Sequence, residues 1–170
     1  MKRFSVLSVV HGVLVAGCGT STSPSAPVKP TFTADLRPSN ETTAVTNAEA
    51  SGSGTATITF DVTKDAAGNI LTSNATFVVN MSAFPAGTAI TGAHIHPGAA
   101  GTAGSVIIST ALAAGEVVLA SGSGSFTKVV TGIDTAVTQN IINNPAGFYF
   151  NIHTAANAGG VARGQLVKVQ

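Results

Sequence analysis

Three histidines are the residues of this chain whose type and spacing could support chemistry. His94 and His96 stand two positions apart between apolar neighbours, and His153 lies in a later segment of similar pattern. In a β-strand, side chains at positions i and i+2 lie on the same face, with their Cβ atoms about 6–7 Å apart. That spacing allows both imidazoles to bind one transition-metal ion. If the two segments form neighbouring strands, His153 completes a three-nitrogen set that leaves one coordination position open, as in catalytic zinc or copper sites.

The same histidines have a second interpretation, as part of a buried polar cluster that holds no metal. Glu41, Asn151 and Arg163 are candidate members of this structural cluster, because the chain offers few charged groups to satisfy one another. Glu41 is also a weaker candidate for a fourth metal ligand, or for a group that orients an imidazole. The residue pattern leaves both interpretations open.

The elements that must position these side chains are predicted to be short β-strands. The chain is rich in Val, Ile, Ala, Thr, Gly and Ser, which is typical of strands and tight turns. The clearest strand is 54–62, where apolar residues alternate with threonine or aspartate. Further strands are expected at 32–36 (an edge strand), 70–82 (one or two strands), 93–96, 105–109, 124–130, 147–154 and 164–169. With 135–143 as the best helix candidate, we expect an all-β antiparallel sandwich or barrel with at most one short helix.

The N-terminal segment has the pattern of an export signal. Lys2 and Arg3 precede an apolar run that is too short to span a bilayer as a stable helix. Residues 15–18, Val-Ala-Gly-Cys, closely resemble a bacterial lipobox, which implies cleavage before Cys18 and acylation of this residue. Several acyl chains anchor a protein stably in the lipid bilayer. Gly19 follows, and by the familiar sorting rule the protein resembles an outer-membrane lipoprotein if the cell is Gram-negative.

These features predict three parts of the chain. Residues 1–17 form the lipoprotein signal peptide, 18–30 the lipidated cysteine and a Ser/Thr/Pro tether, and 31–170 one β domain. Cys18 is the only cysteine, so the exported domain is expected to fold without a disulfide.

The charge pattern excludes a nucleic-acid partner. The formal net charge is +1, and Lys2 and Arg3 account for two of the eight basic residues. The remainder therefore carries six basic and seven acidic side chains, without the basic patch that binding to phosphate backbones requires.

Four separated segments of the domain resemble the CHRD (chordin) domain family. They are 32–36 with the pair 40–41, then 92–98, 147–154 and 160–166. Their shared order and spacing are more specific than any one of them alone. The resemblance covers residues 31–170 and implies an immunoglobulin-like sandwich or Greek-key barrel, as in exported bacterial proteins and animal chordins. It implies no particular biochemical activity. Thr42-Thr43 and Phe150 depart from the family pattern without affecting the histidines.

We therefore expect a membrane-anchored, exported module that binds a protein or envelope partner and is not an enzyme, because no catalytic motif is evident. The alternative is a mononuclear copper- or zinc-binding protein that uses His94, His96 and His153. The His-x-His strand is similar to that of copper-zinc superoxide dismutases, but three histidines are too few for their binuclear site. A third hypothesis is that the histidines titrate near pH 6.5 and tune adhesion.

Overall fold

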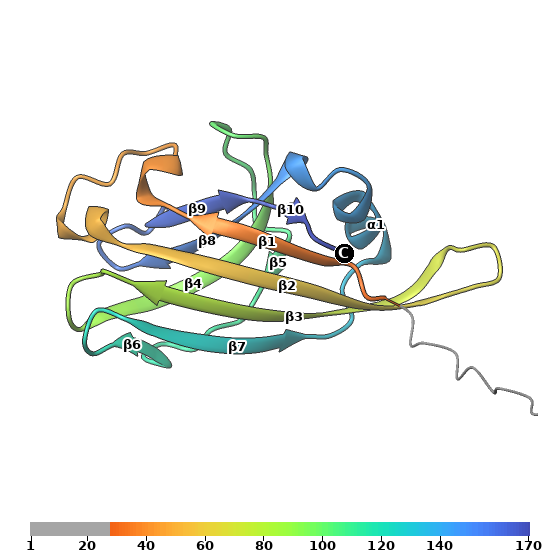
Figure 1. Cartoon of the computed structure of the whole chain (residues 1–170), viewed down its shortest axis with the longest axis horizontal. Helices are drawn as coiled ribbons and strands as arrows, with labels where there is room; N and C mark the ends of the chain where they lie inside the picture. The colour runs from red at the N-terminus through yellow and green to blue at the C-terminus, as the bar shows by residue number, and fades with distance from the viewer. Residues whose placement is uncertain (1–27) are drawn as a thin grey trace, which may run out of the picture.

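Two antiparallel β-sheets pack against each other in the computed structural model, which describes residues 28–170 (Figure 1). The strand order is β10-β1-β2-β3-β7 in the first sheet and β5-β4-β8-β9 in the second, where β6 also pairs with β4. The strands of the first sheet are β1 (Thr31–Leu36), β2 (Ser53–Lys64), β3 (Ile70–Ser82), β7 (Gly124–Val130) and β10 (Val167–Lys168). The strands of the second sheet are β4 (Thr88–Pro97), β5 (Ile108–Ser109), β6 (Val117–Leu119), β8 (Phe148–Thr154) and β9 (Ala162–Gln165). This arrangement confirms the all-β sandwich.

Helices are few in the described part of the chain. They are α1 (Thr135–Asn143) and the 3-10 helices η1 (Pro38–Asn40), η2 (Ala48–Ser51) and η3 (Pro145–Gly147). The helix α1 has the predicted bounds because Asp134 caps its N-terminus, accepting hydrogen bonds from the backbone N–H groups of Ala136 and Val137. Within residues 28–170, no helix combines the length and the apolar character needed to cross a membrane.

The predicted signal peptide 1–17, the lipidation residue Cys18 and most of the tether lie outside the described residues. The structure therefore describes the predicted β domain together with the last three residues of the tether.

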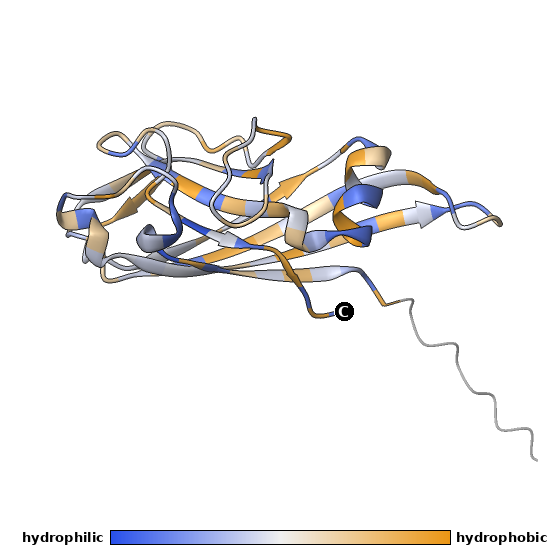
Figure 2. Cartoon of the chain, turned by 90° about the horizontal axis from the view of Figure 1, so that it is seen from above, coloured by the Kyte–Doolittle hydropathy of each residue, from blue (hydrophilic) through white to orange (hydrophobic). Residues whose placement is uncertain are grey.

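The hydrophobic core lies between the two sheets and is built from buried apolar residues at alternate positions of the longer strands. Figure 2 shows the hydropathy of each residue along the ribbon. Ile58 and Phe60 of β2 are fully buried, as the alternation in 54–62 predicts. Phe77 of β3 stacks on Phe150 of β8 with ring centroids 5.8 Å apart, which joins the two sheets at the centre of the core. Each buried phenylalanine contributes about 1.5–3 kcal/mol relative to an exposed one.

The two sheets are also joined along one side. The range 164–169, predicted as one strand, divides at Leu166, because this side chain is buried in the core between β9 of the second sheet and β10 of the first. Beside it, Arg37 and Arg163 exchange two backbone hydrogen bonds of 3.1 and 3.3 Å across the gap between the sheets. This connection holds the end of β1 against the second sheet.

Some strand predictions need correction. The range 105–109 is reduced to the two residues of β5, because the preceding segment leaves the sheet and contacts the outer face of β4 and β8 through Gly104. The strand β6 is absent from the predictions. The range 70–82, expected as one or two strands, forms the single strand β3. β1 lies inside the sheet rather than at its edge, because the short β10 pairs with it.

Candidate metal centre

The three histidines meet because β4 and β8 are neighbouring antiparallel strands. His94 lies opposite Asn151 in the register, and His153 lies opposite Gly92. The intervening residues Ala93 and Ile152 are fully buried in the core between the sheets. Since side chains alternate along a strand, the histidines must lie on the other face of this sheet.

An irregularity in β4 adjusts this pairing. The register shifts between Ile90 and Gly92, so that Thr91 is an extra residue relative to β8. Bulges of this kind redirect side chains and occur often beside functional sites. Here the bulge immediately precedes the segment that carries His94 and His96.

The three imidazoles are close enough to share one ion. One nitrogen from each ring can be chosen so that all three lie within 4.8 Å of one another. Nδ1 of His94 and Nε2 of His153 are 3.0 Å apart. Two nitrogens bound to one tetrahedral zinc ion at about 2.0–2.1 Å are separated by roughly 3.3 Å. The His94–His153 pair is therefore close to the separation that a shared ion requires, and the three rings as a set lie within 4.8 Å.

Backbone carbonyl groups fix the orientation of two of the rings. Nδ1 of His96 lies 2.9 Å from the carbonyl oxygen of Gly104, and Nδ1 of His153 lies 2.9 Å from that of Ala158. A neutral imidazole that donates from Nδ1 presents a lone pair at Nε2. Metal-binding histidines commonly have an outer hydrogen bond of this type, which sets the tautomer and the ring orientation.

One of these lone-pair nitrogens has no partner. Nε2 of His96 is buried and makes no hydrogen bond, and the residue is only 6% exposed. A buried polar atom without a partner costs about 1–3 kcal/mol, so proteins rarely leave one unsatisfied. A bound metal ion would satisfy this nitrogen.

The electrostatic environment favours the neutral forms of His94 and His153. Burial, followed by the nearby charges of His153 and His96 when protonated, lowers the pKa of His94 to about 4. Burial also lowers the pKa of His153, although its hydrogen bond to Ala158 opposes this effect. Neutral imidazoles are the form that binds metal ions.

A glycine makes room for the rings. A Cβ atom at Gly92 would lie 2.9 Å from Cε1 of His94 and 3.6 Å from Cδ2 of His153. The first distance is shorter than carbon atoms tolerate, so a side chain here would displace the His94 ring. The absence of a side chain at Gly92 is therefore part of the site.

The residues predicted for a polar cluster lie beside the histidines. Oδ1 of Asn151 is 3.0 Å from Nε2 of His153. Arg163 is almost fully buried, and its guanidinium lies 4.1 Å from the centroid of the Tyr149 ring. Tyr149 in turn stacks parallel to His96 with centroids 4.9 Å apart. The imidazoles and the polar residues thus form one continuous layer on the outer face of the second sheet.

Glu41 lies outside the three-histidine group. Its carboxylate faces Gly160, where a Cβ atom would come within 2.6 Å of Oε1. Burial raises the pKa of Glu41 to about 7, while the charge of Arg163 and the side chain of Asn151 oppose this shift. Glu41 therefore belongs to the surroundings of Arg163 and Asn151.

Sequence reasoning missed the backbone contributors to the site. Gly104 and Ala158 act through their backbone carbonyl oxygens, which leave no signal in the sequence. Alternation along the strand does place Tyr149 on the same face as Asn151 and His153, but it assigns Tyr149 no role at the site.

Comparison with known proteins identifies a family to which the chain is similar. A family model described as CHRD domain matches residues 32–166. No curated protein and no solved structure gives a significant match.

Proposed function

The chain belongs to the CHRD domain family, and we propose that it is a non-enzymatic binding module whose ligand is one copper or zinc ion. His94, His96 and His153 supply the three nitrogen ligands. The observation that carries this proposal is the buried Nε2 atom of His96, which has no hydrogen-bond partner and belongs to the three-histidine group.

The nitrogen atoms that the three histidines offer favour copper or zinc over magnesium or calcium. Imidazole nitrogens suit zinc and copper, whereas magnesium and calcium prefer carboxylate, carbonyl and water oxygens. Glu41, the carboxylate expected as a weaker candidate for a fourth ligand, lies outside the group. A water molecule or a group from a partner is then expected at the fourth position.

A polar cluster without metal is the competing interpretation. Stacking on Tyr149 and the hydrogen bond to Gly104 hold the His96 ring without help from an ion. Such a cluster is expected to satisfy its buried atoms, however, because a partly satisfied buried network is costly. The free Nε2 atom of His96 therefore favours the metal hypothesis.

Adhesion tuned by histidine titration near pH 6.5 is less well supported. Burial lowers the pKa of His94 to about 4 and also lowers the pKa of His153. His94 would stay neutral across the range in which such a switch would operate, and the lowered pKa of His153 acts in the same direction.

The test is metal titration of the chain after removal of residues 1–18, without a histidine tag. We expect one equivalent of Zn²⁺ or Cu²⁺ to bind with sub-micromolar affinity, measured by calorimetry and elemental analysis. His94→Ala, His96→Ala and His153→Ala should each abolish this binding while circular dichroism remains that of the folded domain. Asn140→Ala, an exposed change on α1, is the matched control. Absence of binding by the unmodified chain would leave the histidines as structural residues.

We further propose that the module is exported and held at a membrane by acylated Cys18, facing an unidentified protein or envelope partner. The lipobox pattern at residues 15–18 and the tether up to residue 30 support this proposal. Metabolic labelling with a fatty acid should mark the chain, and Cys18→Ser should remove the label. A label retained in that variant would contradict the anchor.

A further inference from the structure

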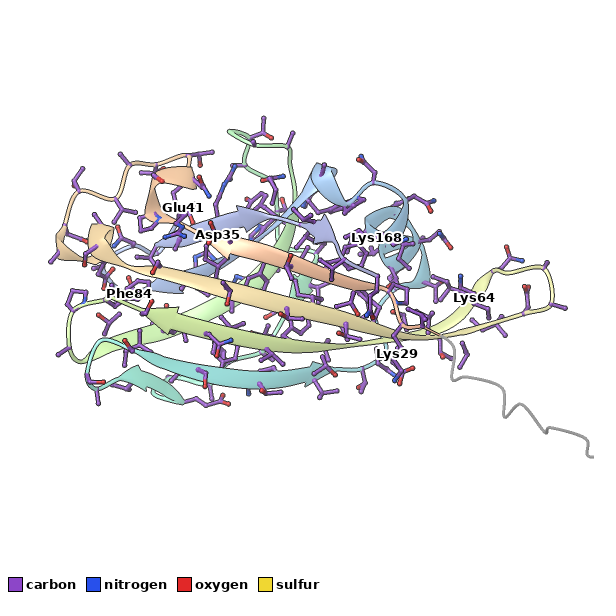
Figure 3. The ribbon with its side chains drawn as sticks, in the orientation of Figure 1. Lys29, Asp35, Glu41, Lys64, Phe84 and Lys168 are labelled. Atoms are coloured by element: carbon purple, nitrogen blue, oxygen red, sulfur yellow. The ribbon has the colours of Figure 1, made fainter. Side chains whose placement is uncertain are left out.

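A polar cleft lies next to the candidate metal centre and is distinct from it. Its volume is about 500 Å³, which is within the range of small-molecule sites. The residues that line the cleft include Asp35, Asn40, Glu41, Ala100 and Arg163. Figure 3 shows Asp35 and Glu41 close together near one end of β1. None of the three histidines lines this cleft.

Two charged residues of the cleft keep buried atoms without hydrogen-bond partners. These atoms are Nη2 of Arg163 and Oε1 of Glu41. Arg163 is 1% exposed, and its other terminal nitrogen, Nη1, donates to the carbonyl oxygen of Thr102 at 3.0 Å. The two side chains are near enough for the charge of Arg163 to influence Glu41, yet no ion pair joins them in the described structure. One donor and one acceptor therefore lack partners at the inner wall of the cleft, where both atoms are buried.

The chemistry of these two atoms restricts the ligand. Nη2 of Arg163 needs an acceptor, and Oε1 of Glu41 accepts a hydrogen bond when the carboxyl group is ionised and can donate one when it is protonated. A hydroxyl group can be either, so two neighbouring hydroxyl groups of one molecule satisfy both atoms. An apolar ligand would leave both atoms unsatisfied. A carboxylate ligand would be attracted by Arg163 but would lie beside the carboxyl groups of Glu41 and Asp35, of which Asp35 is already paired with Arg37. A neutral ligand avoids this additional carboxylate.

We propose that this cleft binds a neutral polyhydroxylated molecule, a sugar or polyol, through Glu41 and Arg163. Asn40 and Asp35 add further polar groups at the walls of the cleft. The same chemistry is offered by a free monosaccharide and by the sugar units of a polysaccharide. Binding here does not depend on the metal proposed for the histidine cluster.

The test is a ligand screen by saturation-transfer NMR and calorimetry on the full chain in detergent. The probes are glucose, mannose, N-acetylglucosamine and sorbitol, with citrate and glucuronate as charged comparisons and a short glucan for the polymeric source. We expect at least one neutral probe to bind with a dissociation constant of about 1 mM, or about −4 kcal/mol. Tighter binding of the glucan than of the monosaccharides would identify the ligand as a polysaccharide. Tighter binding of the monosaccharides would identify it as a free sugar.

Two variants connect the binding to the cleft. Ala100 is exposed, so Ala100→Phe should fill the cleft without disturbing the fold, and it should abolish binding. Glu41→Gln removes the acceptor charge and should weaken binding by roughly tenfold, as the loss of about 1.4 kcal/mol does. Glu116→Gln, an exposed change in the ion pair with Lys128, should have no effect. His94→Ala should abolish metal uptake but leave sugar binding intact.

Other outcomes would overturn the proposal. No binding of any neutral probe would assign the two unpartnered atoms to a bridging water molecule instead. Binding of citrate but of no neutral probe would show that the cleft binds an anion and not a polyol. Binding that is unchanged in Ala100→Phe would place the sugar elsewhere on the protein.

Discussion

Nδ1 of His94 lies 3.0 Å from Nε2 of His153, although 59 residues separate the two histidines in the chain. Two imidazolium groups at this distance would repel each other strongly. The two rings therefore cannot both carry a positive charge near neutral pH. The same distance is close to that between two nitrogens on one metal ion. This pair therefore links the electrostatics of the site to its proposed ligand.

Acidification should reveal the protonation of His94 as a separate step in metal release. Protons compete with a metal ion for the lone pair of His94 near its pKa of about 4. We expect the Zn²⁺ affinity to show an additional steep fall as the pH approaches 4. Calorimetric titrations from about pH 7 to about pH 4 would measure it. An affinity without such a fall near pH 4 would contradict this account.

Gly92→Ala should weaken the site without removing a ligand. The new Cβ atom would lie 2.9 Å from Cε1 of His94, so this ring must move. We expect metal affinity to fall by at least about tenfold, equivalent to about 1.4 kcal/mol, by calorimetry. Gly159→Ala is the matched control, because a Cβ atom there meets no other atom within 4 Å. Equal affinities in the two variants would show that Gly92 does not shape the site.

Much of this arrangement could be predicted from the sequence. Side chains alternate between the two faces of a strand. This alternation predicts that His94 and His96 share one face, and that Asn151 and His153 share one face of the later strand. The helix candidate 135–143, which ends before Asn144 and Pro145, has the same bounds in the structure. These are local signals, which depend only on residues close together in the chain.

The remainder depends on contacts between distant segments. Nothing in the sequence states that β4 pairs with β8, and the meeting of His94 with His153 follows from that pairing. The carbonyl oxygen of Gly104 acts through the backbone, and any residue type provides the same group. Likewise, no local pattern indicated that Leu166 would end one strand and lead the chain into the other sheet.

Arg163→Met should destabilise the domain although it replaces a charged residue by an apolar one. Arg163 is almost fully buried, donates to Thr102 and stacks on Tyr149, and these contacts would be lost. We expect a loss of about 2–4 kcal/mol in the free energy of unfolding, measured with urea. Arg37→Met is the control, because its side chain is about half exposed and forms only a surface ion pair with Asp35. A loss of similar size in both variants would contradict the importance of the buried guanidinium.

The stability of the metal-free domain should reveal two titrations of opposite sign. Burial lowers the pKa of His94 to about 4 from 6.5, so between these values the unfolded state binds the extra proton and stability is lost as the pH falls. Burial raises the pKa of Glu41 to about 7 from 4.5, so between these values the folded state binds the extra proton and stability is lost as the pH rises. The two effects oppose each other between pH 4.5 and 6.5.

Single substitutions should separate these effects. In Glu41→Gln, the free energy of unfolding should rise with pH from 4.5 to 6.5 more steeply than in the unmodified chain, and in His94→Asn it should rise less steeply or fall. One proton changes the slope by at most about 1.4 kcal/mol per pH unit, and partial exposure of both groups reduces this value. Urea unfolding at pH 4.5, 5.5 and 6.5 with a chelator present would measure the slopes. Parallel curves for the three proteins would mean that neither group changes its protonation on folding, and the buried environment described for both would then be wrong.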